Sequence, residues 1–516
     1  MAKKILLVAL SVILLSVGWL GLSGLTLLVA LVPLLMLSSQ YGSSARDFWR
    51  MAGWASLTFV LWNAATIWWV WVATPLGPIT ATIFSTFWNL VAFMLFHYVS
   101  KRASKALSYV LLVAAWVATE YLYTSAEVLS FPWLTLGNGF SGDVWAVQWY
   151  EWTGVFGGSA WVLLANIAIF EALRNRSAAK IGVAAAMVVV PVVVSLALYF
   201  GWEQSEQKIK ASVIQPNVDC YVEKFAGNRD WQYDNLINLM HQVPSDVKLI
   251  VMPETAIPET LNDDLPRSTQ GMSLIEDTVD SLYSQAMAIA GATTVKYYLD
   301  EDQRTPTARR NGAFYYDVYN SAIAINPQMG GEVHHKMRLV IGVEAMPFTN
   351  FLNKFVDLGG ITGQLGRNNI AVPFIKEYIV GPAICYEGLY GECFSCFVRS
   401  GAQVMSVLSN DGWWGNTPGH KRLFDFCRLR AIETRRSIAR SANTGVSGFI
   451  NSRGDVLERM DWDERGVLSN EIELRQDVTL YVRYGDWIGR VCLLITFLGV
   501  MYFTAYRIRR RNHLVE

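Results

Sequence analysis

The sequence predicts a polytopic α-helical membrane domain of eight transmembrane helices joined to an α/β domain outside the membrane. Three observations predict it: an apolar composition, eight long apolar runs, and Lys and Arg residues confined to alternate loops. Hydrophobic residues make up 52% of the 516 residues and charged residues only 17%, and the mean hydropathy is +0.26. These values are typical of a membrane protein. The chain is also long enough for two domains.

A helix needs about 20 apolar residues to cross a bilayer. Such runs lie near 5–20, 23–41, 51–73, 80–99, 107–124, 156–173, 181–201 and 487–506. A Gly-rich turn alone separates the first two, and no such run occurs between 202 and 480. We therefore expect three parts, which are a seven-helix transmembrane domain at 1–201, an extracytoplasmic domain at 202–480, and an eighth helix with a basic tail at 481–516.

The orientation follows from the basic residues, which are retained on the cytoplasmic side. All ten that precede residue 202 fall in segments on one side of the predicted membrane: Lys3, Lys4, Arg46, Arg50, Lys101, Arg102, Lys105, Arg174, Arg176 and Lys180. The intervening loops carry only acidic charges, and the chain ends in an Arg-rich tail. We expect both termini in the cytoplasm of a bacterium and the 202–480 domain on the periplasmic side of its inner membrane. An uncleaved first helix fits better than a signal peptide, because further spans follow it.

The charge balance and the cysteine content argue against several kinds of partner and site. With 43 basic and 43 acidic residues the net charge is zero, so a nucleic-acid partner is not expected. Six cysteines in so long a chain do not form a disulfide scaffold. Cys393 and Cys396 form a single CxxC, for which a buried thiol pair or a local disulfide fits better than zinc.

Short β-branched runs alternate with helical stretches between 202 and 480, which favours an α/β or layered αββα domain. The strand-like runs are 210–215, 247–252, 321–326, 378–384 and 404–408, and the helical ones are 228–243, 272–290 and 419–439.

Three polar residues stand where such strands end. Glu254 closes the run 249–254, Lys336 follows a hairpin-like segment, and Cys385 follows the strand 378–384. A Cys between a strand and a Gly-containing turn is well placed to be an exposed, strained nucleophile. Each residue taken singly is more often structural, so the prediction depends on finding all three together.

These three groups could carry out acyl transfer. A free thiol titrates at about pH 8.5, so it needs a base or a lowered pKa to attack a carbonyl at neutral pH. A Glu in a closed pocket could take the thiol proton and return it to a leaving group. A Lys ammonium, with the backbone N–H groups after the Cys, could stabilise the tetrahedral oxyanion.

At these residues the sequence resembles the nitrilase (carbon–nitrogen hydrolase) superfamily, whose triad is Glu-Lys-Cys. Within that superfamily it is most similar to the apolipoprotein N-acyltransferase family, a membrane-bound branch. The matching segments, which span essentially the whole chain, are 131–137, 253–258, 336–344, 385–387, 409–415 and 440–445. The resemblance implies a nitrilase-like αββα sandwich with Glu254 as general base, Lys336 as oxyanion stabiliser and Cys385 as nucleophile.

The resemblance also implies a two-step reaction with no cofactor and no metal. The Cys385 thiolate would take an acyl chain from a phospholipid, typically phosphatidylethanolamine. The thioester would then acylate the α-amino group of the S-diacylglyceryl cysteine that begins an apolipoprotein. Glu344 would orient Lys336 or the incoming amine, and Tyr386 and Glu387 match residues needed around the nucleophile.

Two segments depart from the family pattern. Ile341-Gly342-Val343 precedes Glu344 where many members have Pro-Phe-Gly, although the spacing from Lys336 is kept. A Trp that follows the first domain strand in some members has no clear counterpart, and Lys224 or Phe225 occupies that region. The sequence does not predict which residues of this region contact the substrate.

Other residues have both a functional and a structural interpretation. The apolar segment 345–365, with Met346, Phe348 and Phe351, predicts a lid that dips into the bilayer surface, and the alternative is a loop packed on the domain. His334 and His335 should lie at the surface. Glu120 could be functional or could bond the 131–137 loop, and Asn410 and Asn443 fit a scaffold of the site.

Two further functions compete with the acyltransferase. A membrane-tethered nitrilase-type amidase would use the same triad but resolve the thioester with water instead of an amine. A non-enzymatic scaffold for envelope proteins would not need an intact triad, so the presence of all three residues argues against it.

Overall fold

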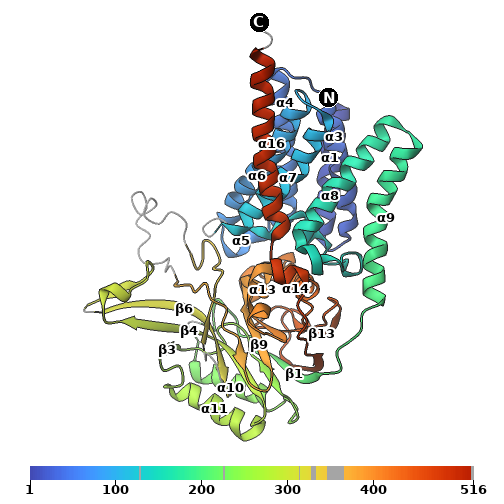
Figure 1. Ribbon diagram of the computed structural model, residues 1–516. Coiled ribbons are helices and arrows are strands. Elements are labelled where there is room, and N and C mark those ends of the chain that lie inside the picture. Colours follow the sequence, from blue (N-terminus) through green and yellow to red (C-terminus); the bar gives the residue numbers. More distant parts are fainter. Residues whose placement is uncertain (127–129, 225–226, 313, 327–332, 346–364, 513–516) are drawn as a thin grey trace.

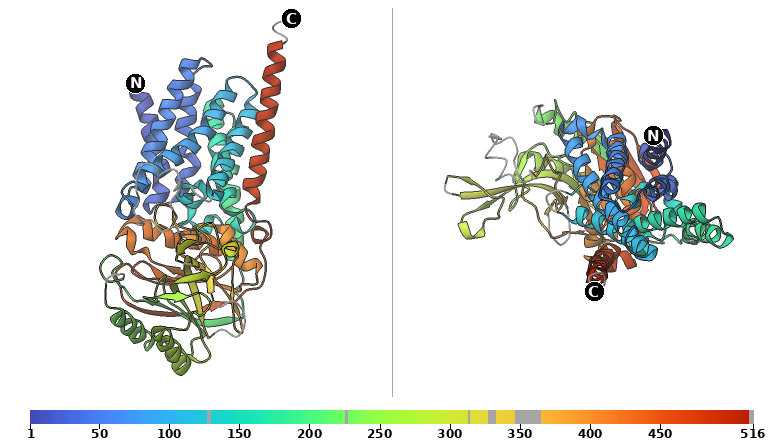
Figure 2. Two further views of the ribbon diagram at one scale, coloured as in Figure 1. Left: turned by 90° about the vertical axis from the view of Figure 1, so that its left-hand side faces the viewer. Right: turned by 90° about the horizontal axis from the view of Figure 1, so that it is seen from above.

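The computed structural model describes residues 1–126, 130–224, 227–312, 314–326, 333–345 and 365–512. A bundle of long helices stands on one side of an α/β domain, and both chain ends lie at the end of the bundle farthest from that domain (Figure 1). A view turned by 90° shows the same arrangement (Figure 2). The membrane and α/β parts predicted from the sequence are thus a bundle and a sandwich in contact with each other.

Six helices of the described residues are long and apolar enough to cross a membrane. They are α1 (Ala2–Val17), α6 (Gly77–Ser100), α7 (Lys105–Ser125), α8 (Tyr150–Asn175), α9 (Ala178–Phe200) and α16 (Trp487–Asn512). Ser104 and Ser177 begin two of them by accepting a hydrogen bond from the backbone of the first turn, as helix N-caps do. These six match six of the eight predicted spans.

The other two predicted spans are helical but less regular. The span at 23–41 consists of η2 (Gly24–Thr26), α2 (Leu27–Ala30) and α3 (Val32–Ser39). It is interrupted because the amides of Leu31 and Val32 donate to Asn166 Oδ1, at 2.7 and 3.0 Å. The span at 51–73 is α4 (Ala45–Ile67) followed by the short α5 (Val70–Ala73).

Glu120, on α7, accepts hydrogen bonds from the Trp116 indole at 3.1 Å and from the Leu136 amide at 2.9 Å. Of its two interpretations the structure therefore agrees with the second, in which Glu120 anchors the 131–137 loop. That loop lies between the bundle and the α/β domain, where it forms η3 (Pro132–Leu134) and the start of η4 (Leu136–Phe140).

The α/β domain contains two β-sheets. The first has the order β14-β1-β2-β4-β6-β5, with β3 beside β4 and β7 beside β6, and the second has the order β13-β12-β11-β10-β9-β8. The strands of the first are β1 (Lys208–Gln215), β2 (Leu249–Val251), β3 (Thr260–Asn262), β4 (Met287–Tyr298), β5 (Arg309–Asn311), β6 (Phe314–Ile325), β7 (Val333–His335) and β14 (Gly466–Glu473). The strands of the second are β8 (Phe374–Ile375), β9 (Ile379–Ile384), β10 (Val404–Ser409), β11 (Ile438–Ala442), β12 (Ser447–Ile450) and β13 (Val456–Met460).

Alternation along the strands explains the four layers. On β2, Leu249 and Val251 pack toward the second sheet, whereas Ile250 packs with α10 (Arg229–Met240) and α11 (Gln270–Tyr283) on the other face. Successive side chains of a strand point to opposite faces, so one strand contributes to both cores. With α13 (Gly391–Arg399) and α14 (Pro418–Thr434) covering the second sheet, the predicted αββα sandwich is confirmed.

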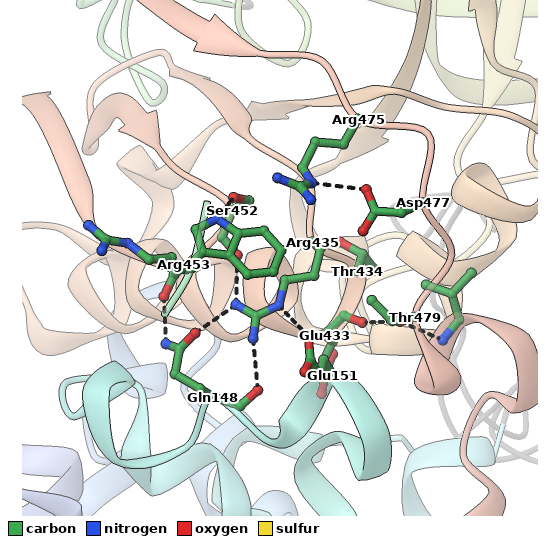
Figure 3. Close-up of polar contacts among 12 residues, drawn as sticks. Gln148, Glu151, Glu433, Thr434, Arg435, Ser452, Arg453, Arg475, Asp477 and Thr479 are labelled. Carbon is green, nitrogen blue, oxygen red and sulfur yellow. Dashed lines mark hydrogen bonds and ion pairs between the residues drawn. The ribbon is translucent and has the colours of Figure 1, made fainter. Parts of the chain in front are cut away.

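A buried polar cluster joins the sandwich to the bundle (Figure 3). Arg435, in left-handed conformation at the end of α14, donates to Glu151 and to Gln148 Oε1, each at 2.6 Å. Its guanidinium also lies 4.3 Å from the ring centroid of Trp202, which begins the link from α9 to β1. An Arg fork with a carboxylate and an amide as partners fixes direction as well as distance. This cluster therefore sets how the sandwich is seated on α8.

Element boundaries lie close to the predicted division of the chain. α9 ends at Phe200 and β1 begins at Lys208, and α15 (Leu480–Tyr484) connects the sandwich to α16. The division at 201 and 480 into separate folding units stays a prediction.

Candidate active site

The site lies at the carboxyl ends of parallel strands, where α/β sheets commonly bind their ligands. β1, β2 and β4 are parallel in one sheet, and β9, β10 and β11 in the other. Glu254 follows the end of β2 and Cys385 the end of β9, so the two sheets contribute one group each.

Cys385 is the first residue of the turn η7 (Cys385–Leu389) and has a φ of +47°. Residues other than Gly rarely adopt this left-handed conformation, and it concentrates at functional positions. The side chain is buried, with 6% of its surface exposed. The left-handed conformation agrees with the strained position that the sequence predicts, but the predicted exposure is wrong because the thiol is enclosed. The role of Cys385 as nucleophile stays a prediction.

Glu254 is held from three directions. Its Oε1 accepts from Asn320 Nδ2 at 2.6 Å and from Lys336 Nζ at 3.1 Å, and its Oε2 accepts from the Asn410 amide at 2.9 Å. Burial alone would raise the pKa of this carboxyl, but the Lys336 ammonium and the Asn320 amide hold the pKa below its usual range. The Cys385 thiol is also a hydrogen-bonding neighbour of the carboxylate. Glu254 is thus ionised and ready to receive a proton.

Lys336 follows β7 and is almost completely buried, with 1% of its side chain exposed. Its Nζ contacts Glu344 Oε1 at 2.9 Å as well as Glu254. Burial would lower the pKa of Lys336, but the two carboxylates raise it above its usual value. An ammonium has three hydrogens, so one is not used by these carboxylates and can reach a third oxygen.

The resting thiol is neutral. Burial raises the pKa of Cys385, and the negative charge of Glu254 raises it further, while Lys336 opposes both. A preformed thiolate is therefore not the resting state. An attack by this sulfur would therefore need a general base to take the thiol proton.

Glu344 keeps its predicted place despite the altered residues before it. Gly342 has a φ of +84°, and the tight turn brings the Glu344 amide to the carbonyl of Val340 at 2.9 Å. The Glu344 Oε2 in turn accepts from the Val340 amide at 2.8 Å. The residues that depart from the family pattern form a tight turn, and this turn still places the Glu344 carboxylate in contact with Lys336.

Two families of known proteins match this chain. The carbon-nitrogen hydrolase family matches residues 210–478, more than half of the chain. A second match, to the apolipoprotein N-acyltransferase N-terminal domain, covers residues 7–168. The chain belongs to the carbon–nitrogen hydrolases, in their apolipoprotein N-acyltransferase branch.

The relatives agree with both matches. The apolipoprotein N-acyltransferase of Chlorobaculum tepidum is 29% identical over 503 residues, covering 94% of this chain and 92% of that protein. The one of Gloeobacter violaceus is 25% identical and covers 94% and 90%. Among solved structures, a carbon-nitrogen hydrolase from Helicobacter pylori is 16% identical, with a TM-score of 0.37 over 55% of this chain and 93% of that one. Nit3 of Saccharomyces cerevisiae, from the nitrilase superfamily, is 18% identical, with a TM-score of 0.35 over 52% and 93%.

Glu387 supports the site of this carbon–nitrogen hydrolase by joining two of its segments. The carboxylate is fully buried and accepts from the Met337 amide and the Ile384 amide, each at 2.6 Å. It therefore fixes the residue after Lys336 to the residue before Cys385. Tyr386 faces the bundle instead, where its hydroxyl donates to the Ser130 carbonyl at 3.2 Å.

Two predicted placements need comment. The predicted surface placement of the two histidines is wrong. Their side chains point to opposite faces of the strand, and each one packs against other residues of the protein. His334 is fully buried beside Glu387 and Phe397, and His335 stacks on Tyr319 at 4.0 Å. Met346, Phe348 and Phe351 lie outside the described residues, so the lid stays a prediction.

The scaffold of the nucleophile is built from the motifs at 409–415 and 440–445. Asn443 Nδ2 donates to Asn410 Oδ1 at 3.2 Å, which agrees with the predicted role of both as scaffold. Asp411 forms a buried ion pair with Arg440 at 2.9 Å. Cys393 and Cys396 are free thiols on α13, and Cys396 lies 3.1 Å from an Arg399 nitrogen.

Sequence reasoning missed two residues and named a third, Lys224, without giving it a role. Asn320 contacts both Glu254 and Glu344. Lys224 is buried, donates to the Glu254 carbonyl at 2.9 Å, and has a pKa that burial lowers to about 8. A Cβ on Gly291 would come within 2.6 Å of the Glu254 Cα, so the strand beside the base must carry Gly. The sequence marks Asn320 only as a polar side chain within β6, which does not distinguish it from Asp317 and Ser321 of the same strand.

An apolar groove of about 810 Å³ opens on the bundle between α4 and α6. Trp68, Trp71, Ile83 and Phe87 line it. Trp69 is buried against Trp133 and Trp414, with ring centroids 4.7 and 5.3 Å away. Trp69 stands in the chain between Trp68 and Trp71, which line the groove. Its contact with Trp414, the last residue of η8 (Asp411–Trp414), therefore brings the groove wall next to the segment that begins beside Asn410.

We expect the substitution Glu387→Gln to weaken both the fold and catalysis, because an amide nitrogen would replace one of the two acceptors. One buried backbone N–H would then lose its partner, at a cost of about 1–3 kcal/mol. Thermal unfolding in detergent and the rate of acyl transfer measure the two effects. Glu377→Gln, at an exposed position before β9, is the control. Equal behaviour of the two variants would show that Glu387 does not hold the segments together.

Proposed function

We propose that the protein acylates lipoproteins in two steps through a thioester on Cys385. The acyl donor is a membrane phospholipid, phosphatidylethanolamine in the first place. The acceptor is the α-amino group of the S-diacylglyceryl cysteine at the N-terminus of an apolipoprotein. The observation that carries this proposal is the convergence of Glu254, Lys336 and Cys385 in one buried site of a chain that matches the family in both its halves.

In the first step the Cys385 sulfur attacks the carbonyl carbon of the donor ester while its proton passes to Glu254. The oxyanion of the tetrahedral intermediate receives hydrogen bonds from Lys336 and from the backbone of η7. When the intermediate collapses, the ester C–O bond breaks and Glu254 gives its proton to the leaving oxygen. The products are the Cys385 thioester and a lysophospholipid.

In the second step the acceptor amine attacks the thioester carbonyl. The nitrogen loses a proton to Glu254, the carbon–sulfur bond breaks, and the sulfur takes that proton back. The products are the amide of the mature lipoprotein and the free Cys385 thiol. Base and acid are thus one residue in both steps, as expected for a carboxylate held against the nucleophile.

Membrane attachment follows from the substrates, since the donor and the acceptor both carry acyl chains. We assign the groove between α4 and α6 to an acyl chain of the donor, because its lining is almost wholly apolar and it adjoins the aromatic cluster at η8. The predicted topology of eight spans, with the sandwich on the periplasmic side and both termini in the cytoplasm, is part of the proposal. A soluble amide substrate would need neither the groove nor the bundle, so the amidase is not favoured.

Incubation with phosphatidylethanolamine in detergent should add the mass of one acyl chain to the intact protein, and peptide mapping should locate it on Cys385. Cys385→Ala should show no adduct, because the sulfur that neighbours Glu254 is removed. Cys427→Ala, at another buried cysteine of the same domain, is the matched control and should be acylated normally. An adduct that survives in Cys385→Ala would contradict the proposed nucleophile.

Filling the groove should impair use of the donor. In Ile83→Trp the larger ring occupies space that we assign to the acyl chain, so thioester formation should slow by about tenfold at limiting phospholipid, the loss of about 1.4 kcal/mol of binding. Ile181→Trp, on the exposed face of α9, controls for the addition of a bulky ring to the bundle. Unchanged donor dependence in Ile83→Trp would remove the groove from the donor path.

A further inference from the structure

Asn320 is the residue of the site with the most unusual contacts. It lies on β6, beside β7, and its carbonyl accepts from the Lys336 amide at 2.9 Å. Its Nδ2 donates to Glu254 Oε1 at 2.6 Å and to Glu344 Oε1 at 2.7 Å. Only 6% of the residue is exposed. One amide nitrogen therefore serves two carboxylates inside the protein.

The same two oxygens are also the ones that Lys336 contacts, at 3.1 and 2.9 Å. Each of the two nitrogens, Asn320 Nδ2 and Lys336 Nζ, thus donates to both carboxylate oxygens, and the four contacts form a closed hydrogen-bonded ring. The orientation of the amide follows from it, since a reversed amide would place Oδ1 within 2.7 Å of two carboxylate oxygens. Among the described residues no donor reaches Oδ1, so that orientation leaves one acceptor unused. A buried orphan acceptor is costly, which indicates that the two donated bonds outweigh it.

The charges explain why two neutral donors matter here. Glu254 and Glu344 share one ammonium, and like charges in one buried site normally force a carboxylate to take up a proton. Lys224 adds a second positive charge near Glu254, but its hydrogen bond does not go to the two carboxylate groups. It goes to the Glu254 backbone carbonyl, and Asp411 is neutralised by Arg440. The amide of Asn320 stabilises the second negative charge without adding a positive one.

We propose that Asn320 is a positioning residue that keeps Glu254 ionised beside Glu344, so that Glu254 enters each cycle as a free base. This inference rests on the function proposed above, because it concerns the base of thioester formation. It assigns to Asn320 no contact with the reacting carbonyl. Its effect passes through Glu254.

The inference predicts a direction for the pH dependence. The Asn320 hydrogen bond lowers the pKa of Glu254, and the base works only when it is unprotonated. Loss of the donor raises that pKa, so the rising limb of the pH–rate profile moves to higher pH. A residue with a merely structural role would lower the rate at every pH and leave the midpoint unchanged.

The test is the pH dependence of thioester formation on Cys385, measured by intact mass with phosphatidylethanolamine in detergent. Asn320→Asp keeps the shape but replaces the donor by a third carboxylate, and its midpoint should rise by about one pH unit or more. Asn320→Ser, which can donate one hydrogen, should show a smaller shift of the midpoint in the same direction. This variant provides the test if Asn320→Asp does not fold. Asn320→Asp combined with Glu344→Gln restores the count of charges and should bring the midpoint back toward that of the wild type.

Tyr319→Phe is the matched control, because Tyr319 precedes Asn320 on β6 and its hydroxyl contacts Tyr298 instead of the site. It should keep the wild-type midpoint. If the wild type forms the thioester and the Asn320 variants keep its midpoint, the inference is wrong while the proposed function stands. If the wild type forms no thioester at any pH, the proposed function itself has failed.

Discussion

Two carboxylates facing one ammonium, away from water, are the constraint on which the rest of this site depends. Burying ions costs several kcal/mol each unless partners replace the lost hydration. In Glu254 the lost hydration is replaced by hydrogen bonds from Lys336, Asn320 and the Asn410 amide. These partners come from three different segments, since Asn320 lies within β6, Lys336 follows β7 and Asn410 follows β10. The arrangement therefore holds only while both sheets keep their register, and this ties the chemistry to the fold.

The second constraint is the position of the sandwich relative to the bundle. The Arg435 cluster fixes one side of the sandwich to α8, and the Trp69 cluster fixes η8 to α5 on another side. Tyr386 adds a direct bond from the residue after the nucleophile to the loop beyond α7. A site that takes its acyl groups from lipid needs this fixed height above the bilayer, and a flexible tether would not provide it.

The sequence carried the architecture and the reacting groups because both leave patterns along the chain. Apolar runs, basic loops and alternation in strands predicted the bundle and the sandwich, and strand-end position with family motifs predicted Glu254, Lys336 and Cys385. Asn320 was missed because one Asn in an apolar strand has no pattern, and only the pairing of β6 with β7 places it beside Lys336. The histidines were misplaced for a related reason. Strand alternation says that His334 and His335 diverge, but not that both sides are packed.

The central claim is that the Cys385 thioester passes its acyl chain to an amine. The most direct measurement isolates the acylated enzyme, free of phospholipid, and mixes it in one turnover with a synthetic peptide whose N-terminal cysteine bears an S-diacylglyceryl group. The account predicts that the adduct leaves Cys385 as an equal amount of N-acylated peptide appears, and that N-acetylated peptide leaves the adduct in place. Release of free fatty acid at the same rate with either peptide would contradict it.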